Sequence, residues 1–347
     1  MLHAPAARTS AILIAILSLY AVTWATGHTG HKEALALLPI AIAPALHRRH
    51  LVAVAHIFFG LALIGLIVAL FQPERVGTHR WLTIPGLGTA QMGTPVAAAT
   101  VLAAGTGTPA WVRILVALAG GGTLVLSRSF SAAGLALTPL FTTGSRRARV
   151  GLAVTIVAAL AALLATNPNR ARRISEHYRG QESTYQVRQL ERVWDSAEVF
   201  HESEKAIRVH LPAKRDDMAF VDIVRRRGKA AGVVVLMLQG LLLWLLFERA
   251  IHHRKSHPMA VGGAVVLTAC CLAHLAVNTA LLPPTGVPMP FIGRGAAAWF
   301  SFAVLVMPHL ARPHEELPTE TPSRSMQALR WISLTALAGA AAFTIAA

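Results

Sequence analysis

The sequence predicts an all-α polytopic membrane protein, and three observations support this fold class. Hydrophobic residues make up 54% of the 347 residues and charged residues only 14%, whereas a soluble domain carries about 25% charged residues. The mean hydropathy is +0.53. The apolar residues also gather in runs, and a helix that crosses a bilayer needs about 20 of them. This composition excludes a disordered chain, a disulfide scaffold and a collagen-like fibre.

Eleven apolar runs are expected to form transmembrane helices. Three of them are short for a bilayer, so we expect these helices to be tilted, broken or shielded by neighbours. The first run could be the apolar part of a signal peptide, but ten more runs follow it, which favours a retained helix. The runs are 10–26, 33–46, 51–71, 94–106, 111–127, 130–143, 150–166, 230–248, 259–282, 294–311 and 328–346.

The distribution of Lys and Arg predicts the orientation in the membrane. With the N-terminus inside, the inner loops hold the basic clusters at 48–49, 146–149 and 254–255. Segment 167–229 then lies outside, where a long loop escapes the charge rule. The eleventh helix places the C-terminus outside as well. The net charge of +16 is therefore attributed to membrane loops, and no nucleic-acid partner is expected.

Segment 167–229 is unusual because it holds ten of the 16 acidic residues. A structureless loop of that length is rare in a compact domain. Leu190, Val193, Trp194 and Ala197 recur at helical spacing with charges between them, which indicates a helix with one apolar face. We expect this amphipathic helix to lie on the outer membrane face. A solvated linker is the alternative interpretation.

The sequence defines no cofactor site. Cys270 and Cys271 are adjacent in an apolar run, so they cannot join distant segments. No CxxC motif and no Cys/His spacing typical of a metal site is present, so redox chemistry is not indicated. Whether a divalent cation assists a reaction is left open.

Three separated stretches match known family patterns. Residues 278–292, NTALLPPTGVPMPFI, resemble the signature GLLPVTGIPLPFISYGG. Residues 77–82, GTHRWL, followed by Gln91, resemble a G-x-x-R-W-L … QPSE loop. Residues 211–220, LPAKRDDMAF, resemble LPEAHTDFIF, and the upstream segment 185–189 matches YQ-x-x-Q. These patterns are those of the SEDS family, the FtsW/RodA/SpoVE group, which the chain resembles over about residues 10–311.

The resemblance implies a peptidoglycan glycosyltransferase that polymerises lipid II at the outer face of the cytoplasmic membrane, in cell division or cell-shape maintenance. Its implied partner is a class B penicillin-binding protein, a transpeptidase. The implied fold is a SEDS-type bundle of ten transmembrane helices with a large outer loop between helices seven and eight. Segment 167–229 falls in that place. Residues 1–311 would form this membrane domain, 312–327 a polar linker, and 328–347 one extra C-terminal transmembrane helix.

The resemblance also implies site residues. Asp217 falls on the family's catalytic Asp and is expected to be the general base for the attacking sugar hydroxyl. Its alternative role is surface pairing with Lys214 or Arg215. Arg80 is the first candidate to contact the diphosphate, followed by Lys214 and Arg215, because cationic side chains suit that charge. A structural bridge is the alternative for Arg80. Substrate contacts are further expected from Gln91, Tyr185, Gln186, Pro288 and Pro290, with capping an alternative for Gln91.

The proline-rich stretch after residue 282 should form a rigid re-entrant loop at the outer mouth of the bundle. Pro fixes φ and ends helices, whereas Gly286 permits a turn. Non-helical backbone at membrane depth is tolerated where it is buried in protein or lines a wet cavity. We therefore expect this loop to be the wall of a pocket; simple helix termination is the alternative.

The chain departs from the family pattern at several points. QPSE becomes QMGT at 91–94, EELG becomes RRRG at 225–228, and Arg294 interrupts the end of the signature. His274 stands where the family often has Asn. A catalytically degenerate scaffold of the division or elongation complex and a transporter of lipid-linked precursors are the alternative functions. The retained Asp217 favours an enzyme, and the near absence of ionisable residues in the spans argues against a transporter.

Overall fold

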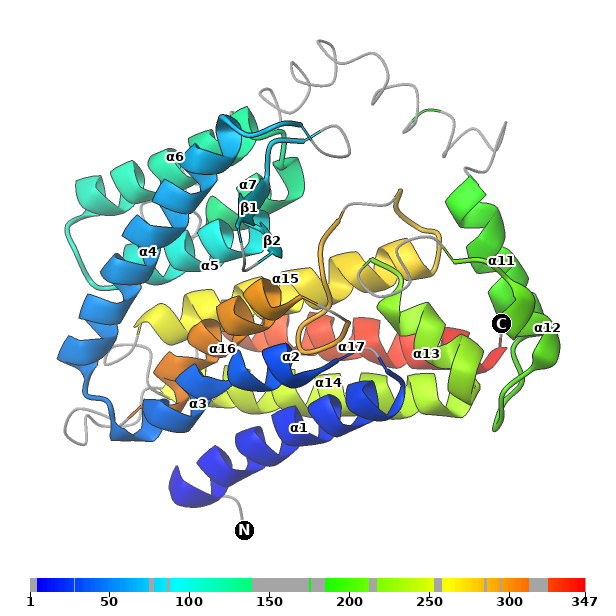
Figure 1. The fold of residues 1–347 in the computed structure, drawn as a ribbon. Helices are drawn as coiled ribbons and strands as arrows, with labels where there is room; N and C mark the ends of the chain where they lie inside the picture. Colours follow the sequence, from blue (N-terminus) through cyan, green and yellow to red (C-terminus); the bar gives the residue numbers. More distant parts are fainter. Residues whose placement is uncertain are drawn as a thin grey trace.

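The computed structural model describes most of the chain, and the described part consists of helices and one two-stranded hairpin (Figure 1). The expected span 150–166 lies outside the described residues, as do parts of segment 167–229 and of the linker 312–327. The described residues are 5–27, 29–74, 78–85, 88–138, 175, 185–211, 217–252, 258–283, 286–293, 295–311 and 324–346.

Most of the predicted spans that lie in the described residues correspond to a helix. By length and composition, Arg49–Leu70, Lys229–Ile251 and Met259–Asn278 are each long and apolar enough to cross a membrane. The described elements are α1 Pro5–Ala25, α2 His31–Leu35, α3 Leu38–Ile42, η1 Ala43–Ala45, α4 Arg48–Leu70, β1 Trp81–Ile84, β2 Gly88–Gln91, α5 Gly93–Ala104, α6 Ala110–Leu126, α7 Phe130–Ala136, α11 Tyr185–Ser196, α12 Glu204–Arg208, α13 Ala219–Arg227, α14 Lys229–His252, α15 Pro258–Asn278, α16 Ala296–Leu310 and α17 Arg324–Ala346.

The short spans have two different explanations. Helix α5 is buried at every residue, because α4, α6, α7, α15 and α16 all pack on it. A helix enclosed in this way does not need to match the thickness of the bilayer. The run 33–46 is instead broken into α2, α3 and η1, and Pro39 and Pro44 lie at the starts of the last two pieces. Proline removes a backbone donor and ends the preceding helix.

Helix α4 lies at the edge of the bundle and exposes an apolar stripe. Ile57, Leu61 and Ile64 are exposed and follow one another at helical spacing. A contiguous exposed apolar face is unfavourable in water and is typical of a surface that meets lipid. This stripe fits a polytopic helical membrane protein.

Helix α11 is the amphipathic helix predicted from residues 190–197, but its environment differs from the prediction. Val187, Leu190, Val193 and Trp194 are buried, and the Trp194 ring lies 5.4 Å from Phe343 of α17. The apolar face of α11 is therefore covered by protein rather than by the membrane surface. Helical spacing predicts that such a face exists, but it does not predict which surface covers it.

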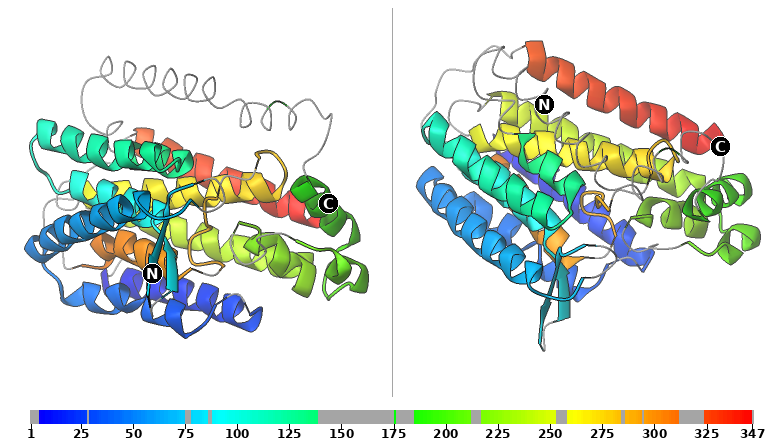
Figure 2. Two further views of the ribbon diagram at one scale, coloured as in Figure 1. Left: turned by 45° about the horizontal axis from the view of Figure 1, so that its top comes forward. Right: turned by 90° about the horizontal axis from the view of Figure 1, so that it is seen from above.

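The C-terminal helix α17 packs lengthwise along α14 at the periphery of the bundle (Figure 2). At one end, Arg330 forms an ion pair with Glu248 at 3.0 Å and lies 4.2 Å from the centre of the Trp244 ring. Near the middle, Leu337 is buried and lies beside Gly240. Helix α17 is thus attached to α14 by an ion pair, by a cation–π contact and by close packing at Gly240.

Candidate active site

The β1–β2 hairpin positions the first two candidate residues, and a purely helical prediction missed it. The antiparallel register pairs Trp81 with Gln91, and the amide of Met92 donates to the carbonyl of Arg80 at 2.8 Å. The side-chain amide of Gln72 holds β1 by bonding both the N–H and the carbonyl of Thr83. Arg80 and Gln91, which are separate in sequence, therefore lie at the same end of the hairpin.

The guanidinium of Arg80 lies against the proline-rich loop at Gly286. A Cβ atom at Gly286 would be 2.8 Å from Nη2 and 3.0 Å from Nη1 of Arg80. Gly286 also has φ +69°, a backbone conformation that residues other than glycine rarely adopt. Glycine thus permits both the turn and the close approach. Burial lowers the pKa of Arg80, and Asp217 opposes that shift.

Arg80 retains hydrogen-bonding capacity in this position. Its Nε is buried and has no hydrogen-bond partner among the described residues. A buried donor without a partner is costly and is usually satisfied by a ligand, an ion or water. Guanidinium N–H donors bind phosphate oxygens well, and the buried Nε is one such donor. The geometry therefore suits binding of an anionic group beside Gly286.

Asp217 lies in the turn directly before α13. Its side chain is half-buried, and burial raises the pKa of its carboxyl group while the Arg80 guanidinium lowers it. The mutual effect on pKa places the two charges in one electrostatic environment. Arg80 thus approaches Gly286 closely, and its charge acts on Asp217 from a third loop that is distant in sequence.

Several buried groups hold the proline-rich loop in a single shape. The carbonyl of Pro290 accepts a hydrogen bond from Gln239 of α14, and the carbonyl of Val287 contacts Nδ1 of His274 at 3.1 Å. The indole N–H of Trp299 donates to Gly293 at 3.0 Å. Side chains of the protein therefore satisfy these three carbonyls of the non-helical loop, which is the arrangement that non-helical backbone needs at membrane depth.

The other predicted substrate residues have varied positions. Gln91 and Pro288 are half-buried, whereas Pro290 is buried. Tyr185 is exposed and Gln186 half-buried at the start of α11, which packs on α12 and α13 rather than on the hairpin. The structure thus brings Gln91 next to Arg80 and Arg80 next to the proline-rich loop, whereas Tyr185 and Gln186 lie on a different element, α11. Lys214, Arg215 and the neighbouring Asp216 lie outside the described residues, as does Arg294.

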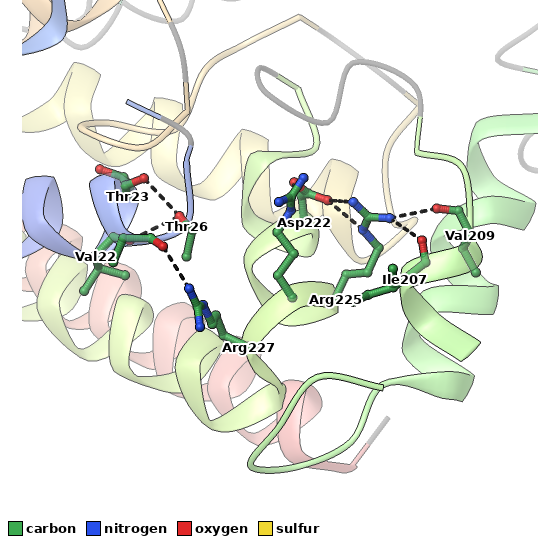
Figure 3. A network of polar contacts seen from close by, with 10 residues as sticks. Val22, Thr23, Thr26, Ile207, Val209, Asp222, Arg225 and Arg227 are labelled. Atoms are coloured by element: carbon green, nitrogen blue, oxygen red, sulfur yellow. Dashed lines mark hydrogen bonds and ion pairs between the residues drawn. The ribbon is translucent and has the colours of Figure 1, made fainter. Parts of the chain in front are cut away.

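The basic run 225–227, where the family pattern is acidic, has a structural role on α13 (Figure 3). Arg225 and Arg226 both form ion pairs with the buried Asp222, and Arg225 also donates to the carbonyls of Ile207 and Val209. Arg227 donates to the carbonyl of Ala25 at the end of α1. These contacts neutralise Asp222 and fasten α13 to its neighbours. Asp222 is therefore a structural acid.

The residue that sequence reasoning missed is Asn278, the last residue of α15. It is fully buried, and its side-chain amide donates to the carbonyl of Asp217 at 2.9 Å. A polar amide at the end of a long apolar run is a signal that could have indicated a role. Among the described residues, no three His, Cys, Asp or Glu side chains form a group that could hold a metal ion.

The fold and site together define a helical membrane protein with a loop-built site that combines one carboxylate and one guanidinium. Residues 34–311 match the family described as "Cell cycle protein", the FtsW/RodA/SpoVE family. The chain belongs to this family, which confirms the prediction from its motifs. The probable peptidoglycan glycosyltransferase FtsW of Halomonas elongata is 26% identical over 281 residues, which are 71% of this chain and 70% of that protein.

Solved structures show the same fold. A chain of a peptidoglycan synthase complex, studied for its coordination of polymerisation and crosslinking, superposes with a TM-score of 0.69 at 19% identity, over 86% of this chain and 95% of that chain. The rod shape determining protein RodA of Thermus thermophilus gives a TM-score of 0.55 at 21% identity, over 85% of this chain and 95% of that chain.

Proposed function

We propose that this chain is a peptidoglycan glycosyltransferase that polymerises lipid II at the outer face of the cytoplasmic membrane, together with a class B penicillin-binding protein. Membership of the FtsW/RodA/SpoVE family supports the reaction class. The observation that supports the assignment to this site is the close approach of Arg80 to Gly286 in the proline-rich loop, together with the effect of the Arg80 and Asp217 charges on each other's pKa.

The chemistry needs a base and an anion-binding group. Asp217, in its carboxylate form, accepts the proton of the sugar hydroxyl as that oxygen attacks the anomeric carbon of the second substrate. The bond from that carbon to the lipid diphosphate then breaks, and negative charge grows on the leaving diphosphate. The Arg80 guanidinium stabilises this charge with its N–H donors.

The environment of Asp217 suits a base. Burial raises the pKa of its carboxyl group, which makes the carboxylate a better proton acceptor than an exposed one. The Arg80 guanidinium opposes this rise, because a nearby positive charge favours the carboxylate form. A carboxyl group whose pKa is raised toward the operating pH is suited to general-base catalysis.

The decisive experiment is polymerisation of lipid II by the purified protein in detergent or in vesicles, with and without the class B penicillin-binding protein. We expect glycan strands to form in at least one of two samples, one metal-chelated and one containing magnesium, and comparison of the two tests whether a divalent cation assists. If neither sample contains glycan, even with the partner present, the enzymatic assignment fails, and a scaffold role in the division or elongation complex takes its place.

A further inference from the structure

Asn278 supplies the hydrogen bonds that hold the backbone around Asp217. Its side-chain oxygen accepts the N–H of Val221 at 3.2 Å, and its side-chain nitrogen donates to the carbonyls of Asp217 at 2.9 Å and His274 at 2.8 Å. The first N–H groups of a helix lack partners within that helix. Met218, the N-cap residue of α13, has no side-chain cap, so Asn278 caps α13 from another helix.

Asn278 is in turn tied to α11 through Trp194. The indole N–H of Trp194 donates to the backbone carbonyl of Asn278 at 3.0 Å. Asn278 ends α15, so its carbonyl is among those that lack a partner within the helix. Both Trp194 and Asn278 are buried, and a buried polar pair in a low-dielectric setting has a well-defined geometry.

The C-terminal helix α17 contacts Trp194 on its other side. The ring of Phe343 meets the Trp194 ring edge-on, with centroids 5.4 Å apart and planes at 76°. The next residue of α17, Thr344, is buried. Its methyl group would lie 3.2 Å from a Cβ atom at Gly232, so α17 approaches α14 closely at this glycine. The end of α17 is thus seated between α14 and α11.

We infer that α17 positions the Asp217 carboxylate through a continuous series of contacts from Phe343 to Trp194 and from Trp194 to Asn278. This inference rests on the proposed function, because it assigns the series to the general base of that reaction. Asn278 is the positioning residue in direct contact with the Asp217 backbone, and Trp194 and Phe343 act through it. The predicted extra helix is therefore part of the active-site support.

Four variants of the full-length protein test the series. Asn278→Leu removes all three side-chain hydrogen bonds and keeps a similarly branched side chain. Trp194→Phe removes the indole donor and keeps a ring beside Phe343. Phe343→Ala removes the ring contact, and Ile345→Ala is the matched control, because Ile345 lies on the same turn of α17 and is exposed.

Polymerisation kinetics provide the first measurement. Loss of positioning should lower kcat by about tenfold or more in Asn278→Leu, and less in Trp194→Phe and Phe343→Ala, with KM for lipid II little changed, because misplacement of a reacting group mainly slows the chemical step. Ile345→Ala should match the wild-type protein. Equal kcat values for all four variants and the wild type would overturn the inference while leaving the proposed function intact.

Hydrogen–deuterium exchange provides a second measurement that does not depend on activity. The amide of Val221 is bonded to Asn278, so it should exchange faster in Asn278→Leu, Trp194→Phe and Phe343→Ala than in Ile345→Ala. If exchange in segment 217–224 is unchanged by Phe343→Ala and Trp194→Phe, α17 does not support the Asp217 turn and the inference is wrong. If the variants show this exchange pattern but the wild-type protein does not polymerise lipid II, the contact series stands and the proposed function fails.

Discussion

Replacement of Gly286 by Ala should reduce polymerisation by displacing Arg80. The new Cβ would lie 2.8 Å from Nη2 of Arg80, so the guanidinium has to retreat by about 0.6 Å to reach an ordinary contact of 3.4 Å. A misplacement of about 1 Å in a positioning group can cost about 100-fold in rate. We therefore expect a loss of roughly tenfold in kcat/KM.

Backbone strain has to be separated from this displacement. Gly286 has φ +69° and Gly27 has φ +73°, so an alanine at either position costs about 1–2 kcal/mol. A Cβ at Gly27 would meet no heavy atom of the described chain within 4 Å. Gly27→Ala is thus the matched control for strain without displacement. The assay is lipid II polymerisation with thermal unfolding measured in parallel. If the two variants polymerise equally well, the contact between Arg80 and Gly286 has no role in the reaction.

Three further predictions concern charge and topology. Arg80→Lys keeps the charge but loses the planar fork, so polymerisation should fall while the melting temperature stays unchanged; a fully active Lys variant with an unfolded Arg80→Ala variant would favour a structural bridge. In the pH dependence of kcat/KM, Arg80→Gln should move the acid limb to higher pH, because the Arg80 charge lowers the pKa of Asp217 and its removal lets burial raise that pKa further; an unchanged limb would disprove the coupling. Reporter fusions at Ser183 and Ala347 should both read periplasmic, and a cytoplasmic signal at Ser183 would overturn the orientation.

The apolar runs in the sequence predicted the long membrane-crossing helices of the fold. Long apolar runs predicted α4, α14 and α15, which are the three described helices long and apolar enough to cross a membrane. The run 33–46 was expected to be broken, tilted or shielded, and two prolines explain the break. The hairpin was missed because each strand has four residues within a Gly-rich connection, which hydropathy alone cannot distinguish from a loop.

The sequence predicted individual residues of the candidate site, but it did not predict how these residues are arranged in space. Motifs pointed to Arg80, Gln91 and Asp217, yet the approach of Arg80 to Gly286 joins residues that are remote in sequence and depends on how the bundle packs. The same holds for Asn278, whose role comes from partners on α11, α13 and α15. Spacing also could not show that Arg225 and Arg226 neutralise Asp222, which accounts for the basic departure from the family pattern.

The most direct test of the central claim compares Asp217→Asn with Asp216→Asn in lipid II polymerisation. Asn keeps the shape of Asp but cannot accept the proton, and loss of a general base typically costs about 10²–10⁴-fold in rate. The account predicts that Asp217→Asn folds, binds the transpeptidase and forms almost no glycan, while Asp216→Asn stays close to the wild type. An Asp217→Asn protein that polymerises as fast as the wild type would contradict the assignment of Asp217 as the catalytic base.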